Sequence, residues 1–429
     1  MKTAPSFALL PAALLASTLA FPSTSFAFAE IARGALTLTT TGRVAHDSNL
    51  SGNAAELSDT IFTLAPTLEY SREAGLGSIN AFLGVAINRY VDLSDFDSED
   101  IYASVRIGLP TPEGAREQGS FTAGYTDSTD INEDVGTRIR SKTWNAGFSG
   151  TFRAGPRTNL RANFAYSDTT RDVFSDREQW SAGVGFDYSD FLGGFGLQGD
   201  YRYSDTQSTR VLGLAGTSID QTSHHVSSGL FYRFVNGLRA SADVGYRWLD
   251  RGASETLSGK TSSNSATFGL RLDGPFLPPA KFPKLKSSFS LGIQQGQTLG
   301  LNDSGSTTLV GDLGLAWQAR ERTSFSVSAS RRQDLAVTNQ STVRNTVSLG
   351  ATQRIGARTS LTASVGQEWT TYGGTGRDDR RTRASLNLGH AFIRDWQAGV
   401  GYALTLSRSS SDTFDYDRHV VSGFVSYKF

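Results

Sequence analysis

From Gly34 to the C-terminus, apolar and polar residues alternate over segments of about ten to fifteen residues, each followed by a connection. Residues 238–248 illustrate the pattern, with one parity occupied by Leu238, Ala240, Ala242, Val244, Tyr246 and Trp248 and the other largely by polar residues. Successive side chains of a β-strand point to opposite faces, so this period predicts strands with one apolar and one polar face. Counting the segments predicts about twenty strands, with eighteen as the alternative.

The connections between these segments alternate in length. Short ones are expected at 153–157, 189–194, 235–237, 319–323, 355–359 and 393–395, and long polar ones at 46–58, 92–100, 127–137, 168–176, 204–221, 250–263, 298–305, 333–341, 373–379 and 407–415. Two proline-containing turns, at 109–118 and 274–286, are longer than the other short ones. This arrangement predicts an all-β fold, a transmembrane antiparallel up-and-down β-barrel with short periplasmic turns and long extracellular loops.

The last segment, 416–429, has Val421, Gly423, Val425, Tyr427 and the terminal Phe429 on one face. A terminal aromatic residue with Tyr two positions earlier resembles the C-terminal signal of bacterial outer-membrane proteins. The resemblance implies that Val425, Tyr427 and Phe429 form the assembly signal read by the outer-membrane assembly machinery. We therefore expect this segment to close the barrel against the first strand, because an open sheet edge is costly in lipid.

The N-terminus has the features of a targeting segment. Lys2 precedes an apolar run from Phe7 to Phe21, and Ala27-Phe28-Ala29 has the small-x-small pattern of a cleavage site. We expect residues 1–29 to be a signal peptide and 30–429 a single barrel domain in the outer membrane of a Gram-negative bacterium. The run is too short and proline-interrupted for a good membrane helix.

The six tryptophans fit this assignment, because indole side chains prefer membrane interfaces. All six lie near the predicted ends of segments and share the parity of the apolar face. The expected interface anchors are Trp144, Trp180, Trp248, Trp317, Trp369 and Trp396.

Composition narrows the classes of function. Hydrophobic residues make up only 38% of the chain, which suits a barrel with an aqueous lumen better than a large apolar core. There is no cysteine, which excludes disulfides and thiolate chemistry, and the formal net charge is zero, so no nucleic-acid partner is expected.

Most of the basic residues are arginine rather than lysine. Parity places about thirteen arginines on the lumen side against six acids, which favours an anionic solute, although charges in a wide lumen are screened. The candidates for contact with solute are Arg161, Arg202, Arg233, Arg239, Arg247, Arg271, Arg344 and Arg383.

Three short turns share a motif, seen as Arg153-Ala-Gly-Pro-Arg157-Thr158, Arg320-Glu-Arg322-Thr323 and Arg354-Ile-Gly-Ala-Arg358-Thr359. Together with the sequence His46-Asp47-Ser48-Asn49-Leu50, these turns resemble the putative beta-barrel porin 2 family, in which the early pattern has Tyr in place of His. The resemblance implies an outer-membrane barrel of a kind often associated with exopolysaccharide export.

The sequence lacks the common motifs of enzymes. There is no Gly-x-Ser-x-Gly elbow or phosphate-binding loop, and the five histidines include no chelating pair, so we expect no enzyme, no cofactor and no metal site. A hydrolase built on His225 with Ser227 on the same face is the weakest of three hypotheses.

Two outer loops, 92–100 and 127–134, are rich in acidic residues. They are either solvated loops or bind divalent cations that bridge to lipopolysaccharide phosphates.

The sequence thus predicts a channel for hydrophilic solutes, with a polysaccharide as one candidate. The second hypothesis is a structural or adhesive surface protein that does not transport. Lipid and lipopolysaccharide are expected partners, and the rigid basic turn 274–286 either docks a periplasmic partner or has none.

Overall fold

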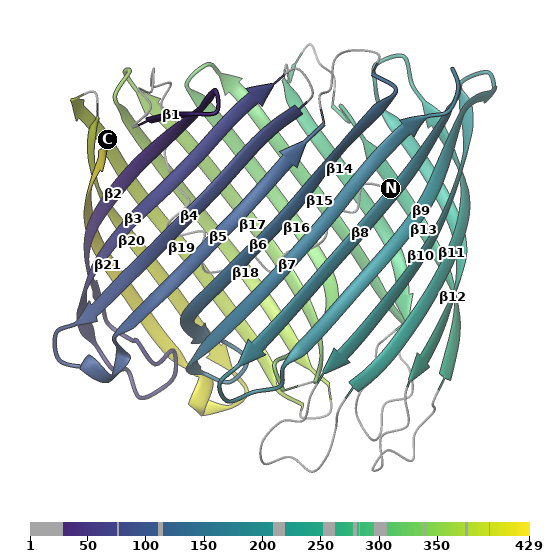
Figure 1. Cartoon of the computed structure of the whole chain (residues 1–429). Helices are drawn as coiled ribbons and strands as arrows, with labels where there is room; N and C mark the ends of the chain where they lie inside the picture. The colour runs from purple at the N-terminus through teal and green to yellow at the C-terminus, as the bar shows by residue number, and fades with distance from the viewer. Residues whose placement is uncertain are drawn as a thin grey trace.

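A computed structural model shows one antiparallel sheet whose strands close into a ring (Figure 1). The structure describes residues 29–74, 77–109, 115–208, 219–251, 262–277, 281–282, 284–295, 307–338, 340–373, 376–393 and 395–429. Twenty strands, β2 to β21, form the ring, each paired with its neighbours in sequence order, and β21 pairs back onto β2. The predicted up-and-down barrel and its strand number are confirmed. The proposed signal peptide lies outside the described residues except for Ala29.

The ring strands are long enough to cross a membrane at a tilt. Their bounds are β2 Gly34–Asp47, β3 Asp59–Ala74, β4 Gly77–Tyr90, β5 Ser98–Gly108, β6 Glu117–Asn132, β7 Thr137–Arg153, β8 Thr158–Arg171, β9 Arg177–Leu192, β10 Phe195–Ser208, β11 Ile219–Arg233, β12 Arg239–Arg251, β13 Ser262–Asp273, β14 Leu285–Gln295, β15 Thr307–Arg320, β16 Thr323–Leu335, β17 Ser341–Ile355, β18 Thr359–Tyr372, β19 Asp378–Ile393, β20 Trp396–Ser409 and β21 Tyr416–Lys428.

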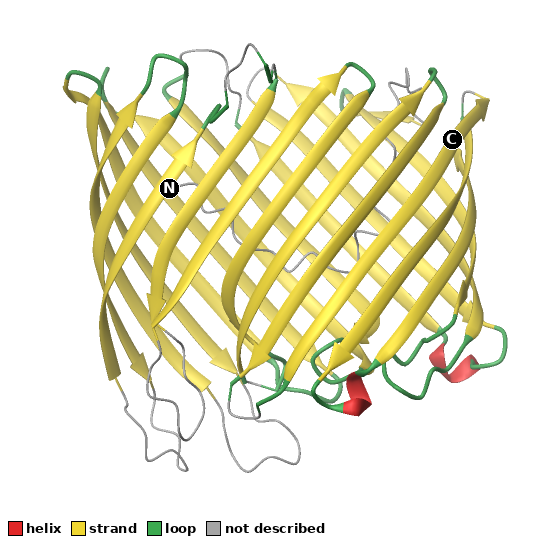
Figure 2. Cartoon of the chain, turned by 180° about the vertical axis from the view of Figure 1, so that it is seen from behind, coloured by secondary structure: helices red, strands yellow, loops and turns green. Residues whose placement is uncertain are grey.

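Short turns gather at one end of the barrel, the turn end, and long loops at the other, the loop end (Figures 1 and 2). Two short 3-10 helices, η2 Ser94–Phe96 and η3 Asp412–Phe414, lie in connections at the loop end. Among the residues described, no helix is both long and apolar enough to span a membrane.

The ring closes between β21 and β2, as the alternation of the last segment predicts. Their register runs from Thr39 opposite Lys428 to Asp47 opposite Val420. At the loop end of this seam, Nη2 of Arg418 lies 2.6 Å from an Oδ2 of Asp47, a carboxylate that is almost fully buried. At the turn end, the amide of Phe429 donates to the carbonyl of Leu38 at 2.8 Å. The terminal residue therefore takes part in closing the barrel.

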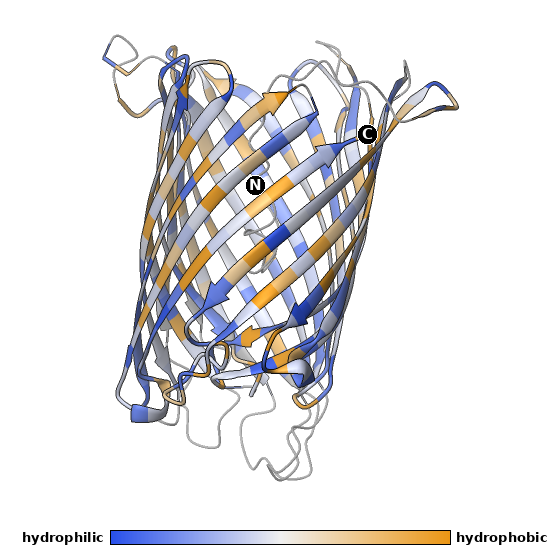
Figure 3. Ribbon diagram, turned by 90° about the vertical axis from the view of Figure 1, so that its left-hand side faces the viewer, coloured by the Kyte–Doolittle hydropathy of each residue, from blue (hydrophilic) through white to orange (hydrophobic). Residues whose placement is uncertain are grey.

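Hydrophobic and hydrophilic residues alternate along many of the strands (Figure 3). Because successive side chains of a strand point to opposite faces, this alternation gives the wall one apolar and one polar face. In β12, the side chain of Val244 is 63% exposed on the outer face, whereas its neighbour Asp243 is 7% exposed on the inner face. An exposed apolar outer face is what a barrel in lipid requires.

Two local expectations were wrong. The acidic stretch from Asp127 was expected to begin a loop, but β6 continues to Asn132, so only residues 133–136 connect β6 and β7. Trp144 consequently lies eighth in β7 rather than at its beginning. A short strand that the sequence pattern does not predict, β1 Ala29–Ile31, pairs with the start of β2 outside the ring.

Candidate functional site

The connection 133–136 folds inward from the loop end and reaches the opposite wall of the barrel. It joins β6 and β7, yet its residues contact β17, β18 and β19. Since β7 and β17 are ten strands apart in a ring of twenty, this contact crosses the mouth of the lumen. We call residues 133–136 the inward loop.

Glu133 is the residue through which the inward loop binds β19. Its carboxylate accepts hydrogen bonds from Nη2 of Arg383 at 2.5 Å and from Nη1 of Arg381 at 3.2 Å, while its carbonyl oxygen accepts from Nη2 of Arg381 at 2.8 Å. Burial by itself would raise the pKa of Glu133, but the charges of Arg383 and Arg381 outweigh it and hold the pKa below its ordinary value of 4.5. Glu133 is thus a charged anchor.

Asp134 makes a second set of contacts. Its carboxylate accepts a hydrogen bond from the hydroxyl of Tyr372 at 2.9 Å, and its carbonyl oxygen accepts from Nη1 of Arg377 at 2.6 Å. The Arg377 guanidinium also lies over two rings, 4.3 Å from the centre of Tyr372 and 3.3 Å from that of Phe414. Stacking of this kind adds to the charged contacts.

These contacts form a network of four arginines and four acids, which we call the mouth cluster. Its charged members are Glu133, Asp134, Arg344, Glu368, Arg377, Asp379, Arg381 and Arg383. Arg381 is the centre of the network: its side chain is 1% exposed and lies within 3.3 Å of carboxylates of Glu133, Glu368 and Asp379. The charges match in number, so the mouth cluster has no net charge.

The mouth cluster corrects two expectations. Glu133 and Asp134 were expected in a solvated or cation-binding loop but are paired with arginines inside the barrel, and Asp127 belongs to β6 and pairs with Arg140 at 2.8 Å. Arg344 and Arg383 pair with acids of the mouth cluster, so their charges are compensated, and their contact with a solute stays a prediction. Arg381 was not among the arginines predicted to face the lumen. Its position two residues before Arg383 in β19 could have indicated the same face.

Other loops join across the same end. The side-chain amide of Asn53, after β2, donates to the carbonyl of Gly136 at 2.8 Å. A second pair of loops also meets here, because Ser175 follows β8 and Val337 follows β16. The hydroxyl of Ser175 donates a hydrogen bond to the carbonyl oxygen of Val337 at 2.9 Å. Because β8 and β16 are eight strands apart, this is a second crossing of the mouth. The loop end is therefore narrowed by interlocked loops.

Further along the inner wall, β8 to β13 carry the other predicted lumen arginines. Asp187 accepts a hydrogen bond from Arg239 at 3.0 Å and lies 3.5 Å from Arg161, which also approaches Asp200 at 3.1 Å. Arg239 lies over the ring of the buried Phe231, 4.0 Å from its centre. Here two arginines share two acids.

The strand register places further basic residues on this wall. His225 lies directly between Arg202 on β10 and Arg247 on β12. Nε2 of His225 lies within hydrogen-bond distance of the Thr267 hydroxyl, at 2.9 Å. Arg271 pairs with Asp273 at 2.6 Å, next to the turn end.

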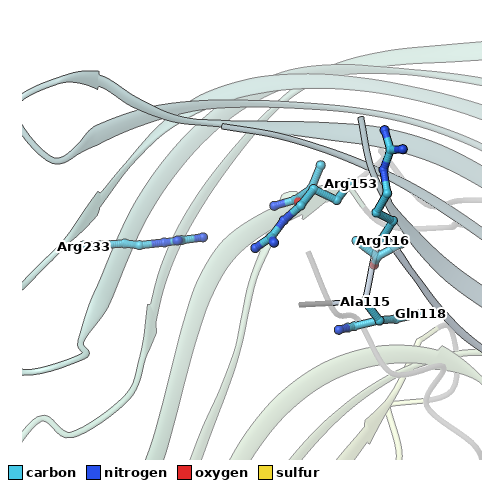
Figure 4. Close-up of a pocket in the computed structure, with 7 residues that line it drawn as sticks. Ala115, Arg116, Gln118, Arg153 and Arg233 are labelled. Atoms are coloured by element: carbon cyan, nitrogen blue, oxygen red, sulfur yellow. The ribbon is translucent and has the colours of Figure 1, made fainter. Parts of the chain in front are cut away.

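A pocket of about 280 Å³ opens on the inner wall at the turn end (Figure 4). It is lined by Ala115, Arg116, Gln118, Thr151, Arg153, Asn159 and Arg233. In Figure 4 the ends of Arg153, Arg233 and Gln118 point toward a common space, whereas the guanidinium of Arg116 points away from it. Arg233 was predicted to face the lumen, but the sequence did not predict that these residues come together.

The remaining predicted residues are placed as follows. The ring of Tyr427 lies between those of Trp396 and Phe429, with its centre 4.7 and 4.5 Å from theirs, and Val425 is exposed on the outer face. Four of the tryptophans are exposed, namely Trp144, Trp248, Trp369 and Trp396. The ring centre of Trp317 lies 5.4 Å from that of Phe282, which belongs to the basic turn 274–286. Pro278, Pro279 and Pro283 of that turn lie outside the described residues. Anchoring, assembly and docking roles stay predictions.

Within the described ranges, no group of three or more His, Asp or Glu side chains is arranged to hold a metal ion. The mouth cluster instead satisfies its carboxylates with arginine. Direct hydrogen bonds of this kind suit holding a loop rather than chemistry on a substrate.

Comparison with known proteins supports this architecture. The sequence model of the family described as Putative beta-barrel porin 2 matches residues 305–429. That span holds β15 to β21, including three of the strands that carry the mouth cluster. No curated protein sequence matches the chain.

Solved outer-membrane barrels share the fold. The ferric citrate transporter FecA in its unliganded form aligns with a TM-score of 0.53 at 10% identity, covering 91% of this chain and 78% of that one. The FrpB iron transporter from Neisseria meningitidis aligns with a TM-score of 0.53 at 9% identity, covering 92% and 81%. The closed form of the ferric-catecholate import receptor Fiu from E. coli K12 gives 0.53 at 8% identity, with 92% and 81% covered.

At such low identity these barrels show the fold alone. The named family is one of porins, and the three structures are transporters and receptors rather than enzymes. The protein is a closed twenty-strand β-barrel of the outer-membrane type that resembles the putative beta-barrel porin 2 family, with the match in residues 305–429.

Proposed function

We propose that the protein is a channel for hydrophilic solutes in the outer membrane of a Gram-negative bacterium. The observation that carries the proposal is the closed ring with apolar residues outside and charged residues inside, seen in the neighbours Val244 and Asp243. Barrels of sixteen to eighteen strands enclose an aqueous channel, and a ring of twenty is wider. A polar interior of this width suits water and dissolved solutes.

The solutes favoured by this interior are anions. The mouth cluster contributes no net charge, whereas the wall formed by β7 to β12 contributes a positive charge to the lumen. Arginines outnumber acids on its inner face, which carries the arginines Arg153, Arg161, Arg202, Arg233, Arg239 and Arg247 and the acids Asp187, Asp200 and Asp243. By strand parity Arg171 and Arg177 lie on the same face near the loop end. An arginine surplus between low-dielectric walls raises the local concentration of anions.

An acidic exopolysaccharide is one solute of this class. The resemblance to the porin family supports this narrower form, and so does the position of Arg153 and Arg233 at the turn end, which a polymer leaving the periplasm would meet first. The interlocked loops would then limit the width available at the exit.

The test is ion selectivity in planar lipid bilayers. Under a potassium chloride gradient, the reversal potential should indicate a preference for chloride. Changing Arg202, Arg239 and Arg247 to serine should move it toward zero, because the surplus charge is removed. Absence of any channel current from correctly folded protein would refute the channel, and cation preference of the unaltered protein would refute the anion preference.

A further inference from the structure

The pocket at the turn end is lined mostly by polar and basic side chains from neighbouring strands. Thr151 and Arg153 are alternate residues of β7, so their side chains lie on the same inner face. In the register of the sheet, Gln118 on β6 lies opposite Thr151, and Asn159 on β8 lies opposite Arg153. Three neighbouring strands therefore present a continuous polar surface beside the turns.

Arg233 faces this surface from β11. It follows Phe231 by two residues and lies over that ring at 5.4 Å, which places it on the inner face as well. Phe231 is buried beneath it and beneath Arg239. The side chain of Arg233 thus stands on an apolar base and extends toward Arg153 (Figure 4).

The two guanidinium groups are not neutralised by the wall. Within the described part of the chain, neither Arg153 nor Arg233 has a carboxylate within 4.0 Å, and their side chains make no hydrogen bond. Next to Arg153 in the sheet register, Asp187 opposite Asn159 is already bound by Arg161 and Arg239. Next to Arg233, Asp273 opposite Arg239 is already paired with Arg271. By contrast, Arg157 in the adjoining turn pairs with Asp190 at 3.2 Å.

The donors fit an anionic group. Arginine presents planar, forked N–H donors that match carboxylate and phosphate oxygens. The side chains of Gln118, Asn159 and Thr151 can donate to the remaining oxygens or to hydroxyls of the same molecule. A pocket of about 280 Å³ holds such a group rather than a whole large solute.

We propose that Arg153 and Arg233, with Gln118, Asn159 and Thr151, form a binding site for a carboxylate or phosphate group of a solute at the periplasmic entrance of the lumen. The proposal deepens the channel function and rests on it for its physiological role. It adds that entering anions pause at a defined site, whereas a general surplus of charge would only concentrate them.

Block of the channel current measures this site. Gluconate, a carboxylate with hydroxyls, and inorganic phosphate are added in turn to the turn side of the bilayer, and the half-blocking concentration is recorded for each. For the double variant Arg153→Ser and Arg233→Ser, we expect this concentration to rise about tenfold to a hundredfold for the better-bound anion, because two charged hydrogen-bonding groups are lost. Gluconate and phosphate then show which oxyanion the pocket prefers.

A matched control is the double variant Arg157→Ser and Arg358→Ser. It removes the same charge from two turns at the same end, but neither residue lines the pocket. Its half-blocking concentrations should stay within about twofold of those of the unaltered protein. The double variant Arg153→Lys and Arg233→Lys keeps the charge but lacks the forked donors, and should give an intermediate value. All variants are first checked for the heat-modifiable mobility of a folded barrel.

Calorimetric titration of the detergent-solubilised barrel with the same two anions separates this proposal from the channel function. Binding that is lost in the Arg153 and Arg233 serine variant, without any current in bilayers, would support the site and refute the channel. Current with equal block in the pocket variant and the control would refute the site and leave the channel standing.

Discussion

Replacing Glu133 by glutamine is expected to detach the inward loop from the far wall while leaving the barrel intact. The residue lies between β6 and β7, so no strand pairing depends on it. Its carboxylate, however, accepts hydrogen bonds from both Arg383 and Arg381. Glutamine keeps one acceptor oxygen and loses the charge.

The size of the effect follows from these contacts. A hydrogen bond to a charged group contributes about 1.5–3 kcal/mol. The carbonyl of Glu133 still accepts from Arg381 in the variant, and glutamine still accepts one bond, so a net loss of about 2–3 kcal/mol is expected. Because 1.4 kcal/mol is a factor of ten, the ratio of attached to detached loop should fall about 30- to 140-fold.

Single-channel recording in planar bilayers measures this ratio. The variant should show a larger mean conductance and more frequent current steps, because a detached loop no longer crosses the mouth. Glu69→Gln is the control: by strand parity it also faces the lumen, from β3, and loses the same charge. Equal conductance and equal current noise in the two variants would show that the Glu133 carboxylate does not hold the loop.

Acid should have the same effect as the substitution. The pKa of Glu133 is depressed in the folded protein, so its contribution to loop attachment is present above its ordinary value of 4.5 and is lost as the pH falls through the lower folded value. Conductance of the unaltered protein should therefore rise below about pH 4.5. The Glu133→Gln variant lacks the carboxylate whose protonation releases the loop, so its conductance should rise less than that of the unaltered protein over the same pH range.

Three further predictions concern assembly and register. Deleting Phe429 together with Tyr427→Ala should leave secretion intact but prevent insertion, because the seam with β2 loses its last contacts; heat-modifiable, inserted protein at normal levels would contradict this. Leu349→Arg, on the outer face in the middle of β17, should lower the free energy of unfolding by about 2–4 kcal/mol, whereas Ser348→Arg beside it should be tolerated in the lumen, as denaturant titration in liposomes can test. Arg418→Met should cost about 3–5 kcal/mol in the same titration by leaving the buried Asp47 charge at the seam, and an unchanged midpoint would show that the pair contributes nothing.

The sequence by itself determined the strands, their order and their two faces. Alternation with a period of two is a local property, and connections of alternating length allow little besides an up-and-down ring. Val244 and Asp243 therefore lie outside and inside as their parity predicts. The closing role of the last strand also followed, because lipid penalises an unpaired edge.

Only the tertiary structure decided which charges meet. Residues 133–136 have no periodicity, and Glu133 binds Arg383, 250 positions later in the chain. That pairing depends on which strands face each other across a closed ring, which no local pattern encodes. The same holds for Arg153 and Arg233, which line one pocket because the wall curves between β7 and β11. Strand parity predicts which arginines lie on the lumen side. Whether their charges are neutralised depends on the acids that the closed ring brings within ion-pair distance.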